Sequence, residues 1–95
     1  MTQQQMQDIL SKYLGESGGR GDQVRSVPAD IDLTFLGAME GETLTVARVV
    51  QVEIAGGLLI ADTIQGERVV LPCEAVRAAR FRGPGVTKRG AGFGD

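Results

Sequence analysis

The sequence predicts a small, mainly β protein: a five-stranded antiparallel barrel preceded by one amphipathic helix and followed by a disordered basic tail. One observation is the apolar period, which is helical near the N-terminus and changes to two from Val27 onward. Another is the glycine-containing turns that separate short apolar runs. At 95 residues the chain forms a single domain. The predicted parts are a helix over 1–15, a Gly-rich linker over 16–26, the barrel over 27–82 and the tail over 83–95.

The N-terminal helix is predicted from an apolar stripe with i, i+3, i+4, i+7, i+8 spacing. The residues of this stripe are Met6, Ile9, Leu10, Tyr13 and Leu14. Thr2 and Gln5 fit a capping box, in which each side chain accepts a hydrogen bond from a backbone N–H of the first turn. A helix this short is marginal in isolation, so we expect the stripe to pack on the barrel, on a sister subunit or on a larger partner. We therefore treat the stripe as a candidate partner-binding helix.

Two strands are predicted at the start of the barrel. Ile31, Leu33 and Phe35 alternate with polar residues, as in a half-buried strand. The following strand, 43–54, has apolar residues at its even positions, and Arg48 is the exception. Either a bulge turns Arg48 outward, or Arg48 is buried and needs a carboxylate partner such as Asp62, Glu67 or Glu53. The functional interpretation is that Arg48 is a specificity or interface arginine.

Three further strands follow. Gly56-Gly57 is a two-residue hairpin turn leading into strand 58–64, and a second turn leads into strand 67–72. Residues 72–75, Pro-Cys-Glu-Ala, are predicted to form one helical turn. The last strand, 76–82, is expected to have Val76 and Ala78 on one side and Phe81 on the other.

This element order resembles that of small SH3-like barrels, and in particular is similar to the Sm-like proteins, where an N-terminal helix precedes five bent strands. The resemblance covers residues 5–82 by element order and implies a closed barrel. Sm-like proteins read RNA with an Asp and an Asn around the second and third strands. Asp62 has no Asn beside it, and the chain contains no Asn. The RNA-binding role of that family is therefore not carried over.

The side chains needed for common catalytic and metal sites are missing. The chain has no histidine and a single cysteine, Cys73, which excludes Ser-His-Asp and Cys-His catalysis and most zinc sites. We predict no catalytic, cofactor-binding or metal-binding residue, and we interpret Cys73 as a small, half-buried apolar residue. The lone cysteine, the absence of a signal sequence and the absence of a long apolar run predict a cytoplasmic protein without membrane association.

Charge is unevenly distributed along the chain. Residues 1–76 carry five basic and eleven acidic side chains, a net charge of −6, whereas residues 77–95 have a net charge of +4. This asymmetry predicts a tail that contacts an acidic surface or a nucleic acid. The candidate contacts are Arg77, Arg80, Arg82, Lys88 and Arg89.

These features favour a non-catalytic interaction or assembly module, an adaptor that binds a protein partner or self-associates through its helix and barrel edge. A domain of this size is marginally stable, which favours a homo-oligomer. Arg48 is the candidate interface residue within the barrel. The alternative is a small RNA- or DNA-binding protein that uses the basic tail.

Overall fold

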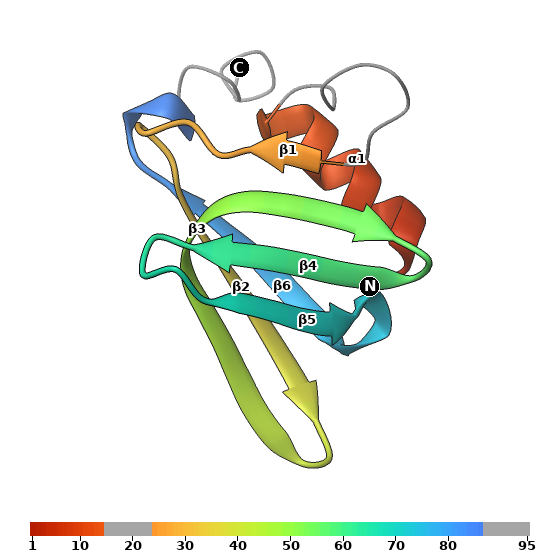
Figure 1. Ribbon diagram of the computed structural model, residues 1–95. Coiled ribbons are helices and arrows are strands. Elements are labelled where there is room, and N and C mark those ends of the chain that lie inside the picture. Colours follow the sequence, from red (N-terminus) through yellow and green to blue (C-terminus); the bar gives the residue numbers. More distant parts are fainter. Residues whose placement is uncertain (15–23, 87–95) are drawn as a thin grey trace.

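The computed structural model describes residues 1–14 and 24–86, which form one helix and a six-stranded antiparallel sheet (Figure 1). A 3₁₀ turn, η1 (Cys73–Ala75), connects the last two strands. The other elements are α1 (Gln3–Leu14), β1 (Val24–Ser26), β2 (Asp32–Met39), β3 (Glu42–Ala55), β4 (Leu58–Thr63), β5 (Arg68–Pro72) and β6 (Val76–Arg82).

The strands are hydrogen-bonded in the order β5-β4-β3-β2-β6, and β1 pairs with the far half of β3. Over the described ranges, no strand pairing joins β5 to β6, so the sheet is open and both strands are free edges. The mainly β class, the N-terminal helix and the antiparallel order are thereby confirmed. The structure does not show the closed barrel that the element order predicted, because β5 and β6 are not paired in the described part of the chain.

The helix α1 docks on the sheet of its own chain (Figure 1). The capping box is confirmed, because the Thr2 N–H donates to Gln5 Oε1 at 2.9 Å and the Gln5 N–H donates to Thr2 Oγ1 at 3.1 Å. Met6 and Leu10 are fully buried in the core between helix and sheet. The centre of the apolar stripe is thus buried against the sheet of the same chain.

Strand β1 begins inside the range 16–26 that was predicted to be linker. Val24 and Arg25 pair with Glu53 and Val52 of β3, so the linker cannot extend beyond residue 23, and residues 15–23 lie outside the described residues. Arg25 is buried and ties the strand to the helix: its Nη1 donates to Gln7 Oε1 at 3.0 Å, and its Nη2 donates to Ser11 Oγ at 2.9 Å. A three-residue strand is too short to show a period.

A bulge interrupts β3 at Arg48, as one of the two interpretations predicted. The register of β3 shifts against β2 between Val46 and Val49, and against β4 between Val49 and Gln51. The φ angle of Arg48 is 55°, in the left-handed region. Val46 and Val49 are both buried, whereas Arg48 is exposed. The two shifts bring Val49 to the core side after Val46 and then return the even positions Val52 and Ile54 to it, which lets one long strand serve two curved parts of the sheet.

A second bulge makes the predicted faces of β6 wrong. The register against β2 shifts at Gly37, leaving Arg77 between two paired residues. After this bulge Ala79 and Phe81 pack on the core together with the buried Val76, and Ala78 lies on the other face. A strict period of two cannot anticipate the extra residue.

The first residues after β6 pack on the loop before β2, although the range from 83 onward was predicted to be flexible. The Gly85 N–H donates to the Asp30 carbonyl oxygen at 3.0 Å, and Gly85 is buried. Gly83 has a φ angle of 108° and lies so close to Asp30 that a Cβ would be 2.5 Å from its carbonyl oxygen. The ordered fold therefore extends to Val86, and residues 87–95 lie outside the described residues.

Candidate functional site

The predicted partner-binding helix offers little free apolar surface. Met6 and Leu10 are inside the core, and Ile9, Tyr13 and Leu14 are half-buried. The Tyr13 ring stacks on Phe81 of β6, with ring centroids 4.5 Å apart. Since the helix uses the centre of its stripe to complete the fold, the candidate interaction surfaces lie on the sheet.

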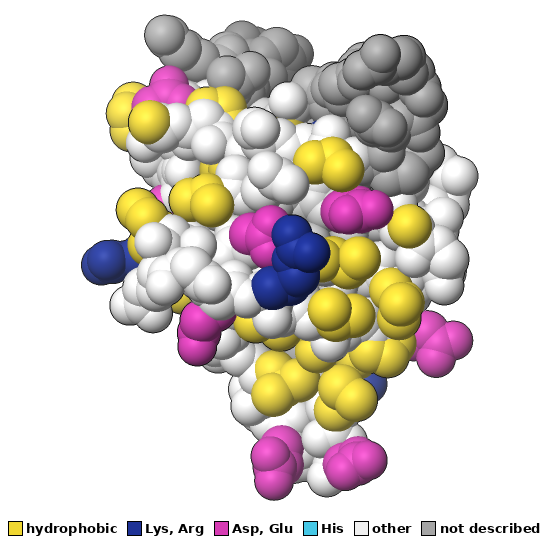
Figure 2. Space-filling model, in the orientation of Figure 1, with side chains coloured by type: hydrophobic (Ala, Val, Ile, Leu, Met, Phe, Trp, Pro, Cys, Tyr) yellow, Lys and Arg dark blue, Asp and Glu magenta, His cyan; other side chains and the backbone are white. Residues whose placement is uncertain are grey.

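The outward side of β4 and β5 is apolar, and we call it the β4–β5 face. It is built from two cross-strand pairs, Leu58 with Pro72 and Ile60 with Val70. Leu58 is 40% exposed and Val70 50% exposed, whereas the alternate positions Leu59 and Leu71 are buried. Figure 2 shows hydrophobic side chains gathered over this part of the molecule. The sequence carried a signal for this surface, because both strands are apolar at even and odd positions.

A surface ion pair borders the β4–β5 face. Arg68 donates two hydrogen bonds to Asp62, from Nε to Oδ1 at 2.7 Å and from Nη2 to Oδ2 at 3.1 Å. These hydrogen bonds hold the pKa of the Asp62 carboxyl below its usual value and raise the pKa of Arg68. Asp62 is therefore engaged by Arg68 on the adjacent strand and is not the partner of Arg48. Exposed pairs contribute little stability, so this pair mainly gives the face a polar border.

The basic candidates are only partly brought together. Arg77, Arg80 and Arg82 are exposed on β6, which is a free edge of the sheet. Lys88 and Arg89 lie outside the described residues. Phe81 is half-buried and is stacked on the helix, which leaves it little surface for a nucleic-acid base.

A second surface, which we call the Arg48 groove, lies where the segment before β2 meets the bulge of β3 and the end of β4. Its volume is about 470 Å³. Its main lining residues are Val27, Ile31, Asp32, Arg48, Val50 and Ile64. The groove combines an apolar surface with one cation, Arg48, and one anion, Asp32. The apolar pattern of β3 singled out Arg48, but no sequence pattern indicates the groove, because its walls come from segments far apart in the chain.

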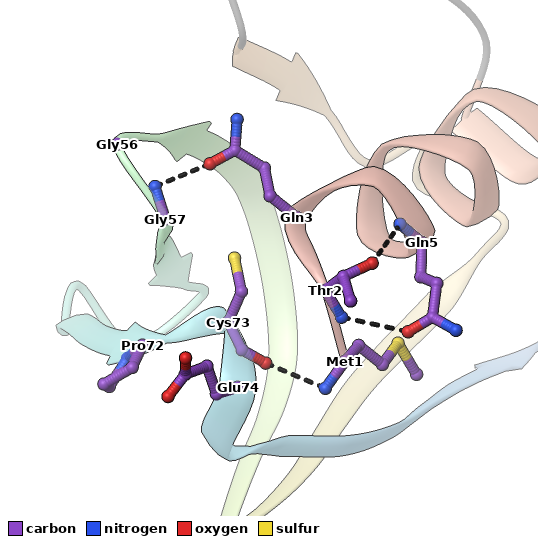
Figure 3. A pocket seen from close by; sticks show the side chains of 9 residues that line it. All are labelled: Met1, Thr2, Gln3, Gln5, Gly56, Gly57, Pro72, Cys73 and Glu74. Atoms are coloured by element: carbon purple, nitrogen blue, oxygen red, sulfur yellow. Dashed lines mark hydrogen bonds between the residues drawn. The ribbon is translucent and has the colours of Figure 1, made fainter.

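An open pocket of about 810 Å³ lies beside the N-terminus (Figure 3). The Met1 ammonium donates to the carbonyl oxygens of Cys73 and Val76 at 3.0 and 2.6 Å, and Gln3 Oε1 accepts from the Gly57 N–H at 2.6 Å. Burial raises the pKa of the Cys73 thiol, which disfavours the reactive thiolate. The polar groups of this pocket thus fasten the start of the chain to η1 and to the β3–β4 turn.

Two further kinds of site are absent from residues 1–14 and 24–86. No helix among them is long and apolar enough to cross a membrane. They contain no group of three or more His, Cys, Asp or Glu side chains placed to hold a metal ion.

Comparisons of the chain with protein-family models, with curated proteins and with solved structures find no match.

Proposed function

We propose that this chain is a non-catalytic interaction and assembly module, with the element order of SH3-like or Sm-like proteins but an open sheet, that binds a second copy of itself or a protein partner through a strand edge. The observation that carries this proposal is the β4–β5 face, which exposes Leu58 and Val70 directly beside the free edge strand β5. Apolar side chains next to unpaired backbone groups are the features that strand addition uses.

The hydrogen bonds between β4 and β5 indicate which backbone groups of β5 are free to pair with another strand. The Cys73 N–H donates to the Gly57 oxygen and the Thr63 N–H donates to the Glu67 oxygen, both at 2.8 Å. Hydrogen-bonded positions alternate along an antiparallel strand, so residues 69 and 71 bond to β4. Val70 then directs its N–H and C=O to the free edge and its side chain to the β4–β5 face.

Replacing Val70 with lysine is expected to weaken self-association at least about tenfold, because a charge would be placed in an apolar strand edge. The measurement is sedimentation velocity over a series of protein concentrations, together with capture of partners on the immobilised chain. Gln4→Lys introduces the same charge on the exposed face of α1 and is expected to leave both results unchanged. A wild-type chain that stays monomeric and captures no protein would contradict the proposal.

A second function, binding of RNA or DNA, is favoured by the three exposed arginines of β6, Arg77, Arg80 and Arg82. It is the weaker candidate because residues 1–76 have a net charge of −6, which repels phosphates. Three phosphate contacts predict a slope of about −2 to −3 for log affinity against log salt, measured by fluorescence anisotropy with labelled oligonucleotides. Arg80→Glu should reduce the affinity for every oligonucleotide to a similar degree. If the wild-type chain binds no oligonucleotide at low salt, this function is excluded.

A further inference from the structure

Arg48 has a backbone conformation that glycine would adopt with less strain. Its φ angle of 55° brings the Cβ of an L-residue close to its own backbone, a strain that glycine avoids. Within residues 1–14 and 24–86, the Arg48 side chain makes no hydrogen bond or salt bridge, and it is exposed. Strained residues of this kind cluster at functional sites. The packing of this chain therefore gives no reason for an arginine at the bulge.

The groove beside Arg48 is apolar and open. Ile64, on one wall, is 64% exposed, the highest exposure among the large hydrophobic residues described, and Val50 is 40% exposed. Asp32, also in the groove, lies opposite Arg82 in the β2–β6 register, so a basic side chain is available to offset its charge. This arrangement suits an occupant that combines an apolar side chain with neighbouring carboxylates.

The β2–β3 hairpin of the same chain has this combination. Its turn, Glu40-Gly41, has φ angles of 52° and 82°, and the carboxylates of Glu40 and Glu42 are both exposed. Met39, directly before the turn, is 38% exposed. The hairpin extends beyond the other strands in Figure 1, and Figure 2 shows acidic side chains at its end. A protruding tip can reach into the groove of another molecule.

We propose that the hairpin tip of one copy docks in the Arg48 groove of a second copy. Met39 contacts the apolar wall at Val50 and Ile64, and the carboxylates at the tip meet the Arg48 guanidinium. The tip and the groove are different patches, so the contact is head-to-tail and can continue into a ring or a filament. The proposal rests on the assembly role above but uses a surface other than the β4–β5 face.

Charge reversal tests this contact by sedimentation equilibrium at two salt concentrations. Arg48→Glu and Glu42→Lys are each expected to raise the dissociation constant at least about tenfold, and salt is expected to weaken the wild-type contact. An equimolar mixture of the two variants should associate again, since each variant supplies the patch that the other lacks. Lys12→Glu and Asp8→Lys, which make the same charge changes at exposed positions of α1 outside both patches, should behave as wild type.

Arg48→Gly separates an interface role from a structural role. It removes the left-handed strain together with the guanidinium, so the melting temperature should stay the same or rise while association falls as it does for Arg48→Glu. A clear drop in melting temperature would show that Arg48 supports the fold and would overturn the proposal.

The outcomes distinguish the two contacts. Association that is lost in Val70→Lys but unchanged in Arg48→Glu and Glu42→Lys overturns the hairpin contact and supports the β4–β5 face. Association that is lost in the charge-reversal variants and restored by mixing them supports the hairpin contact, whatever the result for Val70→Lys. A wild-type chain that is monomeric at the highest concentration measured overturns both contacts.

Discussion

Leu10→Ala is expected to lower the free energy of unfolding by about 2–5 kcal/mol, one of the two largest effects that we anticipate for a single substitution in this chain. The Leu10 side chain is fully buried between α1 and the sheet, with Met6 one helical turn away. Its removal deletes apolar contacts and leaves a cavity that the sheet cannot close. Small domains are stable by only about 5–15 kcal/mol, so the loss is a large part of the total.

Urea unfolding followed by circular dichroism measures this effect. Ile9→Ala is the matched control, because Ile9 lies on the same stripe but is half-buried, and its cost should be clearly smaller. If α1 were a helix held out for a partner, Leu10→Ala would leave the stability of the chain unchanged and would reduce only the capture of that partner. Equal and negligible costs for the two variants would therefore contradict the docked position of α1.

The helix illustrates what a periodic pattern establishes. The spacing of its apolar residues predicted the helix and its buried face, because that face must be covered wherever it lies. The pattern contains no information on what covers it. In the structure the chain's own core covers this face. The buried Arg25 adds hydrogen bonds from β1 to Gln7 and Ser11 of the helix, which depend on contacts between distant segments. Such hydrogen bonds have no local sequence signal.

The strands illustrate where a period of two fails. The turns at Gly56-Gly57 and the 3₁₀ turn after Pro72 were predictable, because glycine and proline restrict the backbone locally. The bulge at Arg48 was signalled by a charged residue on an otherwise apolar face. The bulge at Arg77 had no such signal, since alanines occupy both neighbouring faces of β6. The Arg48 groove depends on the bulge in β3, and so the sequence pattern indicated only Arg48 itself. The β4–β5 face has an unshifted register, and the apolar residues at even and odd positions of both strands were a signal for it.

Gly83→Ala is the second substitution with a large expected effect, a loss of about 2–4 kcal/mol of unfolding free energy. Two physical costs combine at this position. The φ angle of 108° is one that residues with a Cβ rarely adopt, and the added Cβ would lie 2.5 Å from the Asp30 carbonyl oxygen. Because the obstacle is backbone, it cannot rotate away as a side chain would, and the segment before β2 must shift.

Gly41→Ala is the matched control for Gly83→Ala in chemical denaturation. Gly41 also has a left-handed φ angle, 82°, but nothing lies within 4 Å of the added Cβ, so only backbone strain of about 1 kcal/mol is expected. The difference between the two costs measures the close approach of Gly83 to Asp30. If residues from 83 onward formed a free basic tail, Gly83→Ala would reduce the free energy of unfolding less than Gly41→Ala. Slow hydrogen exchange at the Gly85 amide, which donates to the Asp30 carbonyl oxygen, would be independent evidence against a free tail.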